Sequence, residues 1–223
     1  MEAIASTAEA TESSFILPPT IMDRLDFPAI FGDSKPVELE LGAGDGSFLV
    51  EYARVNPDRA FIGVERLLGR LRKIDKKSRR NGLTNVRALR LEASYVLDWM
   101  IPVRGLDALH VYFPDPWPKR RHWGRRLVNA AFTQMAHKAL KTGGVAHLRT
   151  DDETYFAQMQ EVFDANPHFV RDTTPEPLLA VKTDFEKEFN AKGIPTRYAS
   201  WRSLPAPVPE SRPQLGPTIV AIA

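Results

Sequence analysis

The chain has 223 residues, 43% of them hydrophobic and 26% charged, with a net charge of +2, which is the composition of one soluble globular domain. It contains no cysteine, which excludes a disulfide framework, thiolate chemistry and a cysteine-ligated metal. No apolar run approaches the roughly 20 residues that span a bilayer. Residues 1–14 lack the basic and apolar regions of a secretory signal, so we expect a cytoplasmic protein.

Composition divides the chain into three parts. Residues 1–19 are small, polar and slightly acidic, and they predict a disordered leader. Residues 20–204 carry the strand and helix patterns of a single domain. Residues 205–223 form a proline-rich tail.

The first predicted strand covers residues 37–41 and leads directly into glycines at 42, 44 and 46. Apolar residues at helical spacing follow from Phe48 onward. Strand, glycine turn and helix begin a nucleotide-binding α/β sheet, because glycines let a ligand approach the backbone closely. The spacing is not the GxGxxG of dinucleotide sites, and Asp45 would repel a pyrophosphate. We therefore expect an adenosyl ligand with a positive centre; the alternative is a tight turn in another kind of α/β protein.

Acidic residues follow the next two predicted strands. Residues 60–64 read as a buried parallel strand that leads into Glu65, 19 residues past Gly46. A carboxylate at this position can accept hydrogen bonds from both hydroxyls of a ribose. Glu92 follows a third strand at 86–91, at the same edge of the sheet. The alternative is that both acids are merely solvated at strand ends.

Basic charge is concentrated in two segments. Residues 66–80 hold eight Lys or Arg against one acid, and residues 119–126 hold five more. The first segment predicts a helix with Leu67, Leu71 and Ile74 as its core stripe. Such lopsided charge favours binding of a polyanion, although a solvated helix face is the alternative.

A fourth predicted strand, at 106–113, leads into the sequence FPDPWPK at 113–119. Its three prolines at alternate positions remove backbone donors and fix φ, which makes the loop rigid. A rigid loop at this edge would hold Asp115 and Trp117 in place. The alternative is a proline-rich turn around a buried tryptophan.

The remaining patterns predict helices at about 125–140 and 155–163, and strands at 145–149, 169–170 and 198–204. Residues 182–186 are expected to form a charged loop. The alternation predicts an α/β fold with a mostly parallel sheet and helices on both faces. The five histidines show neither metal-ligand spacing nor a Ser-His-Asp arrangement, so we expect no metal and no acyl transfer.

With these motifs together, the chain resembles the bacterial tRNA (guanine-N7-)-methyltransferase family from about Pro36 to Arg202. The most specific parts are the 113–119 loop, Gly143-Gly144-Val145 followed by Thr150-Asp151, and the segment 183–186. The resemblance implies a Rossmann-like class I methyltransferase fold with seven strands, formed by residues 20–204. It also implies S-adenosylmethionine as cofactor and tRNA as partner, methylated at N7 of a guanine in the variable loop.

The resemblance also implies roles for individual residues. Asp115 holds the proposed catalytic position. Residues implied to contact the methyl donor are Glu40, Gly42, Gly44, Glu65, Glu92 and Asp115. Residues implied to line the tRNA side are Lys119, Asp151, Thr183, Asp184, Phe185 and Glu186. Neither a metal nor a membrane is implied, and monomer and homodimer both stay open.

The chain departs from the family pattern at three positions. The family usually has Asp where Glu92 stands, His where Pro118 stands, and Lys where Asp184 stands. The last exchange removes a positive charge near RNA and leaves the role of position 184 open.

Two other functions remain alternatives. The loop is similar to the D-P-P-W/Y loop of amino-directed adenine methyltransferases, although a single proline separates Asp115 from Trp117. A non-catalytic RNA-binding module would also explain the basic segments. The lack of a histidine or cysteine nucleophile agrees with guanine N7 methylation, because guanine N7 has a free lone pair and needs no general base.

Overall fold

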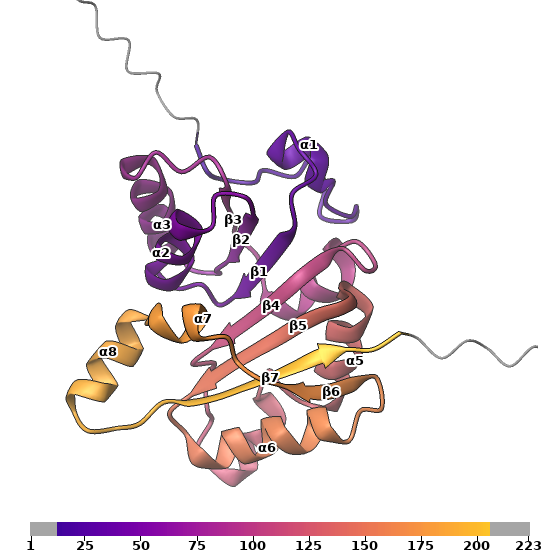
Figure 1. The fold of residues 1–223 in the computed structure, drawn as a ribbon, viewed down its shortest axis with the longest axis vertical. Coiled ribbons are helices and arrows are strands. Elements are labelled where there is room, and N and C mark those ends of the chain that lie inside the picture. Colours follow the sequence, from indigo (N-terminus) through magenta and orange to yellow (C-terminus); the bar gives the residue numbers. More distant parts are fainter. Residues whose placement is uncertain (1–12, 206–223) are drawn as a thin grey trace, which may run out of the picture.

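The computed structural model describes residues 13–205; residues 1–12 of the predicted leader and 206–223 of the predicted tail lie outside them. Within the described part, seven strands form one sheet in the order β3-β2-β1-β4-β5-β7-β6 (Figure 1). The strands are β1 (Val37–Leu41), β2 (Ala60–Val64), β3 (Val86–Leu89), β4 (Leu106–Tyr112), β5 (Leu140–Thr150), β6 (Phe169–Asp172) and β7 (Arg197–Ser203). The first five pair in parallel, and β7 runs antiparallel to β5 and β6. The predicted seven-stranded, mostly parallel sheet is confirmed.

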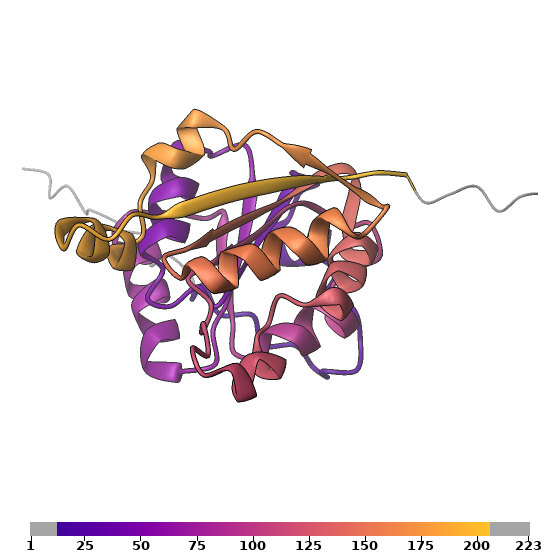
Figure 2. The same cartoon turned by 90° about the horizontal axis from the view of Figure 1, so that it is seen from below.

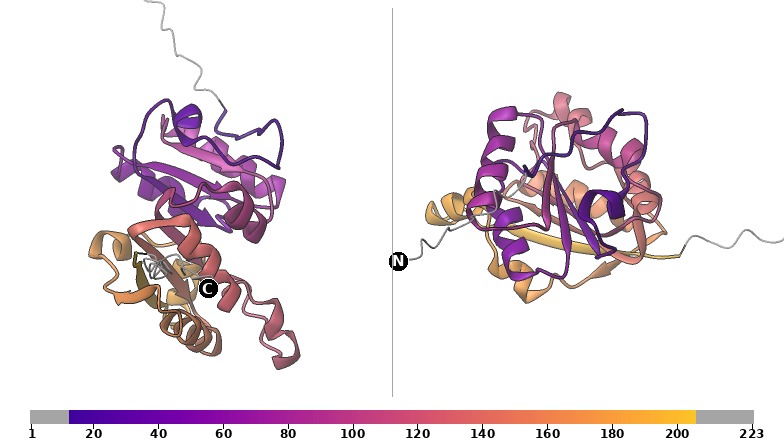
Figure 3. Two further views of the ribbon diagram at one scale, coloured as in Figure 1. Left: turned by 90° about the vertical axis from the view of Figure 1, so that its right-hand side faces the viewer. Right: turned by 90° about the horizontal axis from the view of Figure 1, so that it is seen from above.

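Helices cover both faces of this sheet, as expected. They are α1 (Phe27–Phe31), α2 (Ser47–Val55), α3 (Leu68–Arg80), α4 (Ala93–Tyr95), the π-helical turn η1 (Val96–Met100), the 3₁₀ turn η2 (Arg120–Arg125), α5 (Ala130–Ala139), α6 (Glu153–Asp164), α7 (Glu176–Ala180) and α8 (Asp184–Ala191). One apolar core joins α2 and α3 to the sheet, and another joins α1, η1, α5 and α6 to the opposite face (Figure 3). Figure 2 shows α6 lying along the sheet. No described helix combines the length and apolarity that a membrane crossing needs.

Strand β1 lies at the centre, between β2 and β4. Because helices cover both faces, all five of its side chains are buried, including those of Glu38 and Glu40. Glu38 is compensated by Arg59 Nη1 and His110 Nε2, each 2.7 Å from a carboxylate oxygen. The strand order reverses between β1 and β4, and an open parallel sheet binds its ligands beside the carboxyl ends at such a reversal.

Several predictions differ from the structure. The helix expected from residue 125 begins at Ala130, because the side chain of Asn129 accepts the Phe132 N–H and caps it there. Leu67 is 51% exposed, since it precedes α3, and it is not part of the core stripe. The charged loop expected at 182–186 is wrong, because α8 begins at Asp184.

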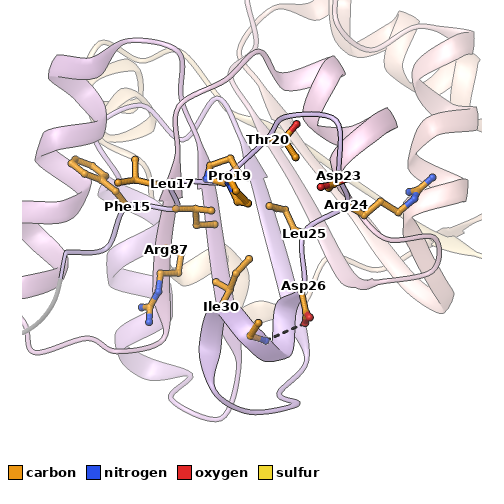
Figure 4. A pocket seen from close by; sticks show the side chains of 13 residues that line it. Phe15, Leu17, Pro19, Thr20, Asp23, Arg24, Leu25, Asp26, Ile30 and Arg87 are labelled. Carbon is orange, nitrogen blue, oxygen red and sulfur yellow. Dashed lines mark hydrogen bonds between the residues drawn. The ribbon is translucent and has the colours of Figure 1, made fainter.

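The end of the predicted leader packs against the sheet edge. The Ser14 carbonyl accepts the Ala88 N–H at 2.8 Å, and the Ile16 N–H donates to the Ala88 carbonyl at 2.9 Å. Disorder is therefore wrong for residues 14–16. The chain then turns back over residues 17–31 and encloses a cavity of about 440 Å³ with Arg87 of β3 (Figure 4).

Candidate active site at the carboxyl edge of the sheet

Two adjoining cavities of about 680 and 370 Å³ lie at the carboxyl ends of the central strands, and we call them the donor-edge cavity and the turn cavity. The donor-edge cavity contains Glu65 and Glu92. The turn cavity contains Glu40, Gly44 and residues 183–185. Both are lined by Gly42, Arg70, Tyr112, Phe113 and Asp115. The fold thus gathers most of the candidate residues in one place.

The glycine turn has a backbone that only glycine adopts without strain. Gly42 and Gly44 have φ angles of +74° and +57°, and a Cβ at Gly46 would lie 2.9 Å from Ile74 Cγ1. The N–H groups of Gly42 and Ala43 both donate to the Val64 carbonyl at 2.9 Å. The turn is therefore fixed to β2 in the free protein.

Glu65 joins the turn to the end of β2. Its two carboxylate oxygens accept the Gly44 N–H at 3.1 Å and the Leu67 N–H at 2.8 Å. The side chain is almost fully buried, and each oxygen retains a lone pair for a ligand hydroxyl. Glu92 is exposed and caps α4 by accepting the Ser94 and Tyr95 N–H groups. Both acids are thus held in place by backbone donors.

Glu40 carries a buried carboxyl group with an unpartnered oxygen. It is 3% exposed, and its Oε2 has no hydrogen-bond partner. Burial raises its pKa to about 8, and the nearby carboxylates of Asp45 and Glu65 add to this, while the Arg149 guanidinium opposes it. A buried carboxyl oxygen beside a cavity fits a cationic or N–H donor group of a ligand.

The loop carrying Asp115 lies between two strained aromatic residues. Phe113 and Trp117 have φ angles of +50° and +45°, which are unusual for bulky side chains. The Phe113 N–H donates to the Arg149 carbonyl at 2.8 Å, and the Arg125 guanidinium lies 5.0 Å above the Trp117 ring. Asp115 is exposed and lines both cavities. The loop presents one carboxylate to both cavities, and its rigidity stays a prediction.

Residues 183–185 line the turn cavity beside the start of α2. The Thr183 side chain caps α8 by accepting the Glu186 N–H at 2.9 Å, and the Asp184 N–H donates to Ser47 Oγ at 3.1 Å. The Asp184 carboxylate forms an ion pair with Lys187 at 3.2 Å, and Phe185 is half exposed. Figure 1 shows α7 and α8 near the ends of β4 and β5.

Glu186 does not face either cavity. It is fully buried, forms an ion pair with Arg149 Nη1 at 3.0 Å and accepts the Tyr198 hydroxyl. Arg149 also donates to the Leu178 and Val181 carbonyls at 2.6 and 2.8 Å. Glu186 therefore fastens α8 to the sheet.

Lys119 and Asp151 line neither cavity. Two of the basic residues expected to bind phosphates are also engaged in the protein, because Arg126 is 1% exposed and Lys77 pairs with Asp45 at 2.9 Å. Conversely, Tyr112 lines both cavities although the sequence did not single it out. Its place at the end of β4 was the available signal.

Known proteins with similar sequences are methyltransferases. A family described as "Putative methyltransferase" matches residues 34–198. The chain is 36% identical over 178 residues to the tRNA (guanine-N(7)-)-methyltransferase of Photobacterium profundum, covering 79% of this chain and 73% of the relative. It is 38% identical to the enzyme of the same name from Idiomarina loihiensis, with 76% and 71% covered. An Escherichia coli enzyme of this name is 37% identical, with 77% and 74% covered.

Solved structures with low sequence identity share the fold. The 16S rRNA methyltransferase KamB superposes with a TM-score of 0.61 at 16% identity, covering 80% of this chain and 93% of that one. TrmN from Thermus thermophilus superposes with a TM-score of 0.55 at 17% identity, covering 79% and 47%. These likenesses establish a class I methyltransferase fold. The relatives above go further, and the chain belongs to the tRNA (guanine-N(7)-)-methyltransferase family.

Proposed function

We propose that this chain transfers a methyl group from S-adenosylmethionine to N7 of a guanine in the variable loop of tRNA. The observation that carries the proposal is that Asp115 lines both cavities, one of them together with the glycine turn and residues 183–185. One carboxylate can thereby contact the methyl donor and the base. With tRNA as its substrate, we also propose that the enzyme works in the cytoplasm.

The residues present fit the donor. The unpartnered Oε2 of Glu40 would accept from the ammonium group, and the remaining lone pairs of Glu65 would accept from the ribose hydroxyls. Glu92 would contact the adenosine end from the same cavity. When bound, S-adenosylmethionine supplies a methyl group made electrophilic by its sulfonium.

The chain's own residues position the guanine and need not remove a proton. N7 carries an in-plane lone pair and no hydrogen, so alignment supplies most of the rate. Asp115 would accept from the N–H edge of the base and offset the charge that moves onto it. Phe185, half exposed at the cavity, would offer a ring for stacking. No histidine lines either cavity, which agrees with a reaction without a general base.

The experiment is mass spectrometry of tRNA nucleosides after incubation with enzyme and S-adenosylmethionine. N7-methylguanosine, formed only with both present, is the expected product. N6-methyladenosine would support the amino-directed alternative instead. No product, together with no heat in a calorimetric titration of S-adenosylmethionine, would support a non-catalytic RNA-binding module.

A further inference from the structure

Arg126 is the most enclosed basic residue near the Asp115 loop. Its guanidinium is stacked between two rings, 4.5 Å from the centre of Trp123 and 4.8 Å from that of Tyr155. With 1% exposure it cannot reach an RNA phosphate. Arg126 therefore does not share the phosphate-binding role expected of the basic residues at 119–126.

The hydrogen bonds of Arg126 run between α6 and the loop. Its Nη1 donates to Gln158 Oε1 at 2.9 Å, and its Nη2 donates to Thr154 Oγ1 at 2.8 Å. Its Nε donates to the Pro116 carbonyl at 2.7 Å. The guanidinium thus links a rigid helix to the residue that follows Asp115.

The loop has few other attachments. Pro114 and Pro116 have no N–H group, and within residues 13–205 the backbone of 114–117 makes its one hydrogen bond through the Pro116 carbonyl. The strained φ of Trp117 follows immediately. A strained backbone persists only where its surroundings hold it.

We propose that Arg126 is a positioning residue, which holds the Asp115 carboxylate in place for methyl transfer through the Pro116 carbonyl. This inference rests on the proposed function, since it gives Asp115 a role in the reaction. Only arginine has the planar fork that serves Pro116, Thr154 and Gln158 together, so lysine would keep the charge and lose the link.

The test is a double-mutant cycle with Arg126→Lys and Asp115→Ala, read as N7-methylguanosine formed under saturating donor. We expect Arg126→Lys alone to lower kcat by about 10- to 100-fold, because small misplacements at a reacting centre have effects of this size. The KM for tRNA should change by less than about threefold. With Asp115→Ala already present, Arg126→Lys should lower kcat by less than about twofold. Donor-binding stoichiometry counts the folded enzyme in each sample.

Arg171→Lys is the control, because the Arg171 guanidinium also lies over an aromatic ring, 4.8 Å from the centre of Trp201, but belongs to β6 and lines neither cavity. It should leave kcat unchanged. If Arg126→Lys does not fold, Gln158→Ala removes one acceptor of the same guanidinium and takes its place in the cycle, with a loss of about 3- to 10-fold expected.

Independent effects of the two substitutions in the cycle would overturn the inference, and so would an unchanged kcat for Arg126→Lys. Absence of product from the wild-type enzyme is a separate outcome, which would overturn the proposed function itself.

Discussion

The donor-edge and turn cavities differ in kind from the cavity enclosed by residues 15–30 and Arg87 (Figure 4). In the latter, Asp26 caps α1 and Arg24 donates to the Ile101 carbonyl, so these two charged groups have partners. At the carboxyl edge, Glu40 Oε2 has no hydrogen-bond partner, and Phe113 and Trp117 have positive φ angles. Backbone strain and an unpartnered buried carboxyl group therefore mark the proposed active site, and cavity size alone does not distinguish the two places.

The largest expected effect is that of Asp115→Ala, at the centre of the carboxyl edge. It should lower kcat/KM by about 10²–10³-fold, because the proposed role brings the carboxylate into contact with the reacting groups. The melting temperature should hardly move, because Asp115 is exposed. Asp115→Asn keeps the shape without the charge and separates these contributions. An active but destabilised alanine variant would mean that Asp115 only stabilises the turn.

Leu25→Ala, in the cavity enclosed by residues 15–30 and Arg87, should lower stability and leave activity unchanged. Leu25 is 6% exposed, so its truncation should lower the free energy of unfolding by about 2–4 kcal/mol. Chemical denaturation measures this, and kcat/KM per folded molecule should match that of the wild type. A loss of activity in fully folded protein would show that this cavity also serves the reaction.

Glu65→Ala should weaken S-adenosylmethionine binding by about 1.5–3 kcal/mol, the usual value for hydrogen bonds to a charged group. Calorimetry should then show a Kd raised about 10- to 150-fold. Glu51→Ala is the control, since Glu51 pairs with Arg54 on the surface of α2. An unchanged Kd for Glu65→Ala would place the ribose elsewhere.

Glu40 should make stability depend on pH. Burial raises its pKa from 4.5 to about 8, so between these values the folded protein binds more protons than the unfolded chain. Its contribution to stability is therefore complete below pH 4.5 and is lost as pH rises toward 8. The melting temperature of Glu40→Gln should exceed that of the wild type by a margin that grows from pH 5 to pH 8. A constant margin would mean that Glu40 is already ionised.

The smallest expected effect distinguishes two lysines of α3. Lys73 lines the turn cavity, whereas Lys76 is exposed and lines none of the three cavities. If tRNA phosphates approach over the carboxyl edge, Lys73→Gln should make the log–log salt slope of tRNA binding shallower by about 0.7–0.9. Lys76→Gln should leave it unchanged. Equal slopes for both variants would mean that the basic face of this helix is merely solvated.

Local patterns predicted much of the carboxyl edge. The alternation in 37–41, the glycines after it and the acid at Glu65 lie next to one another along the chain or along adjacent strands. Residues 183–186 also carried a local signal for a helix, because Thr183 and Glu186 have the spacing of a capping box. The prediction of a charged loop did not use this signal.

What depends on distant partners could not be predicted. The pairing of residues 14–16 with Ala88 is invisible in their composition. Arg126 looks like any other member of a basic run until α6 encloses it. The burial of Glu40 follows from the central place of β1, which only the assembled sheet determines.

We propose that guanine N7 methylation takes place at the carboxyl edge and not in the cavity enclosed by residues 15–30 and Arg87. The most direct measurement is the amount of N7-methylguanosine formed in tRNA by equal concentrations of folded wild type, Asp115→Ala and Leu25→Ala, by mass spectrometry. We predict equal initial rates for wild type and Leu25→Ala, and a rate about 10²–10³-fold lower for Asp115→Ala at subsaturating tRNA. Formation of this nucleoside by Asp115→Ala at the wild-type rate would contradict the account.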